Sequence, residues 1–216
     1  MKNFTISRSD ALIVVDPQLD FCPGGALAVA DGDAIMRPIS ILAQNFDTAD
    51  ATIVLTQDWH PFDHQSFASS HEVEPFSMIA MPYGDQVAWP DHCTQGDLGA
   101  TFHFGIREAE ELASIIIRKG MNPNIDSYSA FYENDQTTKT GLAGFLRDRG
   151  ITRCFFVGLA YDFCVGYSAL DARREGFEAV VVKDYTRAIN MPVNGVGTTS
   201  QVIEQKFALA GVIVDG

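Results

Sequence analysis

Residues 154–176 read CFFVGLAYDFCVGYSALDARREG, and this stretch contains the repeating unit from which the fold class can be predicted. It begins with a short apolar run, CFFVGL (154–159), of the kind that forms a buried strand. The pattern over 163–175 then predicts a helix, and Gly176 is the residue type that commonly ends one. A second apolar run, AVVVK (179–183), follows at once. The stretch therefore predicts a strand–helix–strand unit.

The same unit recurs along the chain. Apolar runs that predict strands lie at 11–15, 51–55, 114–118, 154–159, 179–183 and 211–214. Helical patterns lie between them at 33–48, 107–112, 138–149, 163–175 and 198–209. Because the runs are apolar on both faces and alternate with helices, we expect an α/β fold: a doubly wound, mostly parallel six-stranded sheet with helices on both faces.

The chain is long enough for one well-buried core, so its 216 residues predict a single domain spanning 1–216. Residues 59–106 break the strand–helix rhythm, since they contain four prolines and no convincing long helix. A connection this long is usually functional or disordered, and its many aromatic residues argue against disorder.

Composition excludes some classes of function. Fifteen Lys and Arg against 28 Asp and Glu give a net charge of −13, which repels nucleic-acid backbones. No apolar run is long enough to cross a membrane, and no secretory signal is recognisable, so we expect a cytoplasmic protein. Its four cysteines do not need to be paired, and Cys154 is expected to be a buried strand thiol. Whether the chain is a monomer or a homodimer stays open.

Reactive side chains follow several of the predicted strands. Ligands of open α/β sheets bind outside the carboxyl ends of the strands. Asp16, Lys119 and Cys164 all fall at that edge. Cys164 opens a predicted helix, whose N-terminus can lower a thiol pKa, although a small apolar filler is an equal alternative. Lys119 can pair with Asp16, or can be an ordinary solvated lysine; together the three residues indicate a site.

The stretch TQDWHPFDHQSF (56–67) indicates a metal site. Asp58 and His60 are two residues apart, which places both side chains on the same face of an extended chain. His92 in WPDHC offers a third ligand. One aspartate and two histidines suit zinc, iron or manganese. A polar loop that happens to contain histidine is the alternative, and spacing does not exclude the other histidines, His64, His71 and His103.

Taken together, the motifs ALIVVDPQLDFCPGGALAV, TQDWHPFDHQSFASSH, WPDHCTQGDLGATFH, DSYSAF and VGLAYDFCVGYSALDA carry a family resemblance. In this order, over about residues 10–190, the chain resembles the nicotinamidases (pyrazinamidases) of the isochorismatase-like cysteine hydrolase family. The resemblance implies hydrolysis of nicotinamide to nicotinate and ammonia through a cysteine thioester, in NAD salvage. It also implies that pyrazinamide is accepted.

The resemblance assigns roles to individual residues. It implies a catalytic triad of Asp16, Lys119 and Cys164, in which Asp16 takes the thiol proton, and an oxyanion hole formed by the backbone N–H groups of Ala160 and Cys164. It implies one divalent metal ion, zinc before iron or manganese, on Asp58, His60 and His92. His64 matches a further ligand in only some relatives and is left out. It implies a ring pocket of Phe21, Trp89 and Tyr128, and a cis peptide before Ala160.

Two departures from the family stand near the cysteine. Tyr161 replaces a frequent threonine and Phe163 a frequent tyrosine. Tyr161 is expected near the mouth of the pocket, where it would alter substrate breadth. Two alternatives to a nicotinamidase stay open: a cysteine amidohydrolase of another small amide or ureide, and a metal- or thiol-sensing protein without turnover.

Overall fold

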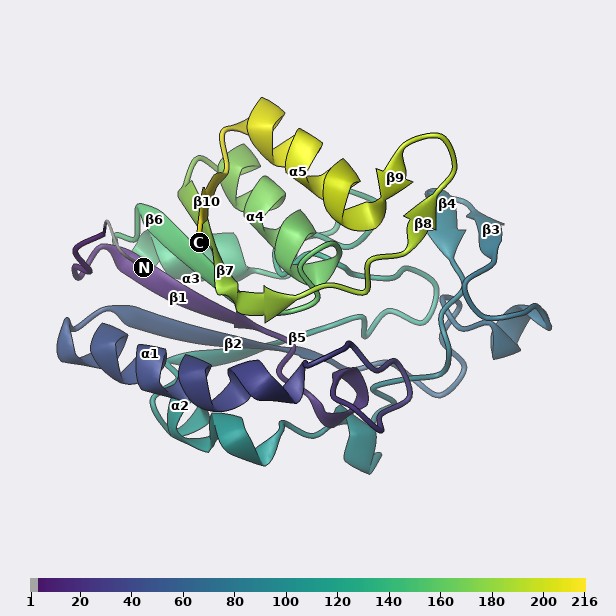
Figure 1. Cartoon of the computed structure of the whole chain (residues 1–216), viewed down its shortest axis with the longest axis horizontal. Helices are drawn as coiled ribbons and strands as arrows, with labels where there is room; N and C mark the ends of the chain where they lie inside the picture. The colour runs from purple at the N-terminus through teal and green to yellow at the C-terminus, as the bar shows by residue number, and fades with distance from the viewer. Residues whose placement is uncertain (1–3) are drawn as a thin grey trace.

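The computed structural model describes residues 4–216 and is built on one central parallel sheet (Figure 1). Six strands form this sheet: β1 (Asp10–Val15), β2 (Thr52–Asp58), β5 (Ile115–Lys119), β6 (Arg153–Leu159), β7 (Glu178–Arg187) and β10 (Ile213–Asp215). Their order is β10-β7-β6-β1-β2-β5, and every neighbouring pair is parallel. The six predicted strands are confirmed.

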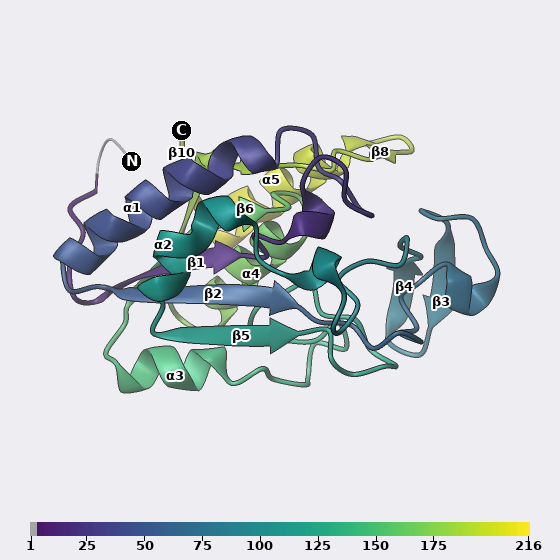
Figure 2. The same ribbon diagram turned by 90° about the horizontal axis from the view of Figure 1, so that it is seen from below.

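Helices cover both faces of the sheet, as Figures 1 and 2 show. Five α-helices lie on it: α1 (Met36–Thr48), α2 (Arg107–Glu111), α3 (Leu142–Asp148), α4 (Cys164–Arg174) and α5 (Thr199–Ala210). In β1, Leu12 and Val14 pack on the α1 and α2 side, whereas Ile13 and Val15 pack with α3, α4 and α5. This alternation follows from the two-residue period of a strand and produces two buried cores, one on each face.

The strand order brings distant parts of the chain to one edge. From β1 the chain proceeds outward to β2 and β5, and then crosses to β6 on the other side of β1. The carboxyl ends of β1 and β6 therefore flank the point where the direction of winding reverses, which is where ligands bind in folds of this kind. Residues that follow β1, β2, β5 and β6 meet there.

Several boundaries differ from the predicted ones. Two strands run further toward the edge than predicted, so that Asp58 and Lys119 are their last residues. The predicted helix at 138–149 begins only at Leu142, after Gly141 with φ +97°. The predicted strand at 211–214 begins only at Ile213, because Gly211 ends α5 in the left-handed conformation.

Two hairpins lie outside the central sheet and were not predicted. They are β3 (Met78–Met81) with β4 (Gly84–Val87), and β8 (Pro192–Val193) with β9 (Gly197–Thr198). Residues 82–83 join β3 to β4 and read Pro-Tyr, which lacks the Asn-Gly or Asp-Gly signal of a tight hairpin. Short 3₁₀ helices lie at Leu19–Phe21, Asp33–Ile35, Ser69–His71, Leu98–Ala100 and Phe104–Ile106.

Two further observations concern the whole described chain. All four cysteines are free and buried, and Cys154 lies within β6 as predicted. No helix within residues 4–216 has the length and apolar character needed to cross a membrane.

Candidate active site

Three of the predicted site residues meet at the sheet edge. Asp16 directly follows β1, Lys119 is the last residue of β5, and Cys164 is the first residue of α4. Lys119 Nζ lies 2.8 Å from Asp16 Oδ2 and 3.4 Å from Cys164 Sγ. The lysine reaches them although β2 separates β5 from β1. All three side chains are buried, so Lys119 is not a solvated lysine.

Backbone and hydroxyl groups hold this cluster in place. The chain leaves β1 through a left-handed residue, Asp16 with φ +44°, a conformation that is uncommon outside glycine. Thr56 Oγ1 on β2 donates to Asp16 Oδ1 at 2.6 Å and accepts the Asp16 N–H at 3.1 Å. Lys119 Nζ also donates to the Ser127 carbonyl at 2.9 Å and to Asp58 Oδ1 at 3.0 Å. The lysine therefore bridges two carboxylates.

Burial governs the acid–base state of the cluster. It raises the pKa of Asp16, and the opposing effect of Lys119 does not cancel the rise. Burial alone lowers the pKa of Lys119, but the Asp16 and Asp58 carboxylates raise it well above its usual value. Burial also raises the pKa of the Cys164 thiol, and the Lys119 charge only moderates this effect. Burial therefore opposes the lowering of the thiol pKa that a helix N-terminus can cause, and a base is needed to form the thiolate.

Two backbone N–H groups face the strand–helix turn without internal partners. The Leu159–Ala160 peptide is cis, as predicted. Within residues 4–216, the N–H groups of Ala160 and Cys164 meet no acceptor. Unpaired donors beside a nucleophile are what an oxyanion hole requires.

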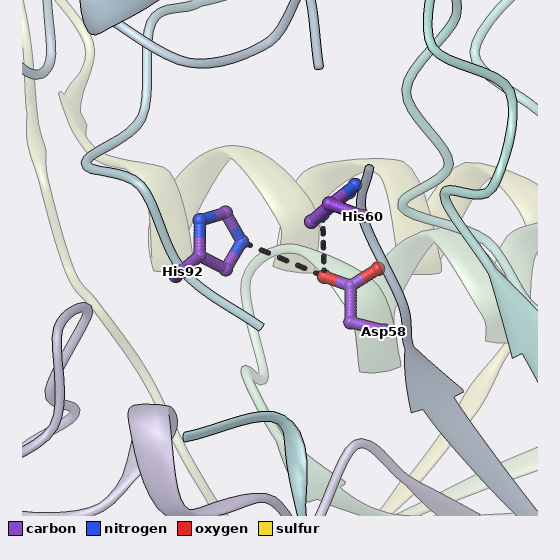
Figure 3. A group of neighbouring side chains, drawn as sticks. All are labelled: Asp58, His60 and His92. Carbon is purple, nitrogen blue, oxygen red and sulfur yellow. Dashed lines mark ion pairs between the residues drawn. The ribbon is translucent and has the colours of Figure 1, made fainter. Parts of the chain in front are cut away.

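The predicted metal ligands form a second cluster beside the first. His60 Nε2 lies 3.2 Å and His92 Nε2 3.5 Å from Asp58 Oδ2, and Figure 3 shows both rings approaching this one carboxylate. All three side chains are buried. Gly120 (φ +64°) makes room for the His60 ring, since a Cβ there would lie 2.4 Å from His60 Cε1.

The hydrogen bonds of the two rings fit a metal ion. Nδ1 of His60 lies 2.9 Å from the Gly120 carbonyl, and Nδ1 of His92 lies 2.7 Å from the Pro90 carbonyl. A carbonyl only accepts, so each neutral ring carries its hydrogen on Nδ1 and keeps the Nε2 lone pair for a ligand. His60 Nε2 is also buried without a hydrogen-bond partner. These residues fit a divalent cation.

His64 differs from the other two histidines. Its ring lies close to that of His60, with centroids 4.2 Å apart and the ring planes tilted by 49°. The Ser66 backbone N–H donates to His64 Nδ1 at 3.1 Å, which leaves the hydrogen of a neutral ring on Nε2. Burial lowers the pKa of His64 to about 4, so the ring is neutral near pH 7. Among the described residues, His64 Nε2 is buried without a hydrogen-bond partner, and His60, His64 and Asp126 form a second group whose ligand atoms lie close enough to hold a metal ion, so His64 as a further ligand stays an open alternative. His71 and His103 lie outside the group of close ligand atoms.

A small pocket, with a cavity volume of about 20 Å³, opens onto both clusters. Its lining includes the predicted Phe21, Trp89 and Tyr128, together with Asp58, His92, Ala160 and Cys164. Four lining residues were not predicted as site residues: Leu27, Asp126, Phe163 and Ile189. Three of them stand within motifs that the sequence analysis quoted, which was a signal that could have identified them: Leu27 in PGGALAV, Asp126 in DSYSAF and Phe163 in YDFC. Ile189 stands in no such motif.

Tyr161 was expected at the mouth of this pocket, and that expectation is wrong. The ring packs edge-on against Phe207 of α5, with centroids 5.9 Å apart. Its hydroxyl donates to Glu204 Oε1 at 3.1 Å.

A larger groove lies elsewhere on the molecule, lined by residues such as Asp33, Arg37 and Glu108, and it contains none of the predicted site residues.

The chain is similar to several known proteins in sequence and fold. Residues 10–195 match the Isochorismatase domain. The nicotinamidase of Acinetobacter baylyi is 52% identical over 182 residues, which cover 84% of this chain and 82% of that protein. A solved nicotinamidase/pyrazinamidase of Acinetobacter baumannii is 45% identical, with a TM-score of 0.90 over 98% of this chain and 97% of that chain. A pyrazinamidase of Pyrococcus horikoshii, solved in complex with zinc, is 33% identical, with a TM-score of 0.75 over 95% and 98% of the two chains.

Proposed function

The chain belongs to the isochorismatase family, and we propose that it hydrolyses nicotinamide to nicotinate and ammonia. It is a hydrolase of the carboxamide C–N bond, and its product, nicotinate, serves NAD salvage. One observation carries the assignment to this site: Lys119 Nζ contacts both Asp16 and Cys164 at the wall of a pocket that also holds Asp58 and His92. Because relatives with the same fold act on pyrazinamide, this amide is proposed as a second substrate.

The triad performs the first half of the reaction. Asp16 takes the proton of the Cys164 thiol, and the Lys119 ammonium stabilises the thiolate and the carboxylate. The sulfur attacks the carboxamide carbon, and the N–H groups of Ala160 and Cys164 bind the oxygen as it becomes negative. Asp16 then returns the proton to the leaving nitrogen, ammonia departs, and a thioester remains on Cys164.

The second half reverses these roles with water. Asp16 takes a proton from the water that attacks the thioester carbon, and the same two N–H groups bind the oxyanion again. The carbon–sulfur bond breaks, the thiolate regains a proton, and nicotinate leaves. Phe21, Trp89 and Tyr128 would bind the faces and edges of the pyridine ring during both halves.

Asp58, His60 and His92 would hold one divalent metal ion, with zinc favoured over iron and manganese. When bound, such an ion would act as a Lewis acid that can accept the lone pair of the pyridine nitrogen, and this would orient the carboxamide toward the sulfur. A single domain over 1–216, a cytoplasmic location and a monomeric or homodimeric state stay predictions from the sequence.

Ammonia release from nicotinamide tests the proposal. The wild-type protein, supplied with zinc, iron or manganese, should release ammonia, and Cys164→Ala should release none. Hydroxylamine should divert the wild-type thioester to the hydroxamate of nicotinic acid. His60→Ala should bind less metal by elemental analysis and show a raised KM. Turnover of a ureide or carbamoyl amide in place of nicotinamide would instead favour a different amidohydrolase, and no turnover of any amide would favour a thiol sensor.

A further inference from the structure

The β3–β4 hairpin buries one polar side chain. The hairpin lies at one end of the molecule, away from the central sheet (Figures 1 and 2). Most of its residues are exposed or half-buried, including Met78 at 62% exposure. Gln86 is the exception, at 1% exposure. Burying an amide is unfavourable unless its polar atoms are bonded, so the partners of Gln86 explain why it is there.

The amide of Gln86 is fully bonded and its orientation is fixed. Nε2 lies within hydrogen-bond distance of three acceptors that share its two hydrogens: Asp126 Oδ2 at 2.9 Å, Tyr128 Oη at 2.8 Å and the adjacent Val87 carbonyl at 2.9 Å. Oε1 accepts from Asn134 Nδ2 at 3.0 Å. Exchanging the oxygen and nitrogen would set Oε1 against the Asp126 carboxylate and Nε2 against another NH₂ group, so this arrangement alone satisfies the partners.

The partners of Gln86 belong to the wall of the pocket. Asp126 and Tyr128 both line it. Tyr128 Oη also accepts the indole N–H of Trp89 at 3.2 Å, and the two rings meet edge to face with centroids 6.1 Å apart. Asn134 completes the connection, since its Oδ1 accepts the Tyr128 backbone N–H at 3.0 Å. One amide therefore joins Trp89 to Asp126 and Tyr128, two parts of the pocket wall that lie far apart in the sequence.

We propose that Gln86 is a positioning residue that sets the aromatic wall for a flat heteroaromatic amide. The inference rests on the proposed nicotinamidase function. Gln86 is absent from the lining of the pocket and contacts none of the triad or metal-ligand side chains; it acts through Tyr128 and Asp126. The hairpin thus has a role in substrate recognition, because it inserts the amide that fixes the Tyr128 hydroxyl and, through it, the Trp89 ring.

Gln86→Met is the direct test, because methionine keeps the length of the side chain and removes both polar atoms. Without the hydrogen bonds from Gln86 to Asp126 and Tyr128, the KM for nicotinamide should rise about tenfold, since the free energy of one ordinary hydrogen bond corresponds to about a tenfold change in a binding constant. The kcat should stay within about twofold, because the wall binds the ring equally in the ground and transition states. Near-ultraviolet circular dichroism should change as the Trp89–Tyr128 contact loosens.

Gln65→Met is the matched control. Gln65 lies in the same long segment, and its side-chain amide bonds only the Asp63 carbonyl. Its KM, kcat and circular dichroism should stay at wild-type values. Asn134→Asp is a second variant, which removes the NH₂ group that donates to Gln86 Oε1 and should raise the KM about threefold.

The outcomes separate this inference from the function on which it rests. Wild-type protein that releases no ammonia from nicotinamide contradicts the proposed function. Active wild-type protein together with a folded Gln86→Met variant of unchanged KM, or of lowered kcat at unchanged KM, overturns the positioning role alone. Should Gln86→Met fail to fold, Asn134→Asp decides, because it keeps an acceptor for the Tyr128 backbone N–H and removes only the NH₂ group that donates to Gln86 Oε1. A raised KM in this variant supports the role, and an unchanged KM overturns it.

Discussion

Replacing Lys119 by methionine should abolish most of the activity. The substitution keeps a long flexible side chain and removes one buried positive charge. In the structure Lys119 Nζ lies 2.8 Å from Asp16 Oδ2 and 3.0 Å from Asp58 Oδ1. The side chain of the lysine is fully buried, so water cannot take its place without rearrangement.

The size of the effect follows from these distances. Two opposite unit charges about 3 Å apart attract by about 5–6 kcal/mol at an effective dielectric constant of about 20. Desolvation offsets part of this, and removing one partner of a buried pair costs about 3–5 kcal/mol. Without the lysine, Asp16 and Asp58 cannot both stay ionised, and a protonated Asp16 cannot take the thiol proton. We expect kcat/KM to fall by about 10²–10⁴.

Thiol chemistry checks the same reasoning independently of turnover. The Lys119 charge lowers the pKa of Cys164 against the larger effect of burial. Its removal should therefore raise that pKa, slow alkylation by iodoacetamide at neutral pH and move the alkylation profile to higher pH. Lys139→Met is the control, since Lys139 is a surface lysine paired with Glu175 and should leave both measurements unchanged. Ammonia release within tenfold of wild type, with an unshifted alkylation profile, would refute this account of the triad.

Three further predictions follow from other contacts. Thr56→Val removes the hydroxyl that donates a hydrogen bond to Asp16 Oδ1, and it should lower kcat/KM about 10–100-fold while the fold is retained. Steady-state kinetics together with a melting curve checks this, and a variant with wild-type kinetics would contradict it. Glu175→Gln should lower the Tm at pH 7 by about 2–4 °C. A hydrogen bond from Tyr132 lowers the pKa of Glu175 from 4.5 to about 2, so the stabilisation by the ionised Glu175 is present above pH 4.5 and is lost as the pH falls toward 2. A Tm difference between wild type and variant that stays constant over this pH range would argue against this explanation. Tyr161→Phe should leave the ratio of nicotinamide to pyrazinamide hydrolysis unchanged, because the ring packs on α5, and an altered ratio would return Tyr161 to the pocket.

The predicted site residues show where inference from the sequence succeeds. Asp16 and Cys164 come after strongly apolar strands, Lys119 ends another strand, and the carboxyl ends of parallel strands share one edge. Their proximity therefore follows from the fold class. The direction of the thiol pKa shift did not follow, because its largest cause is the burial of Cys164, which depends on residues from several elements.

The sequence by itself determined the fold class, the six strands, the five helices and the residue types gathered at one edge, since these depend on local periodicity and on motifs read along the chain. The tertiary structure alone decided which side chains touch. It brought Lys119 past β2 to Asp16, turned Tyr161 toward α5, and placed Gln86 behind the pocket wall. Such contacts depend on strand order, on the path of long loops and on the reach of individual side chains, and no local pattern in the sequence encodes these.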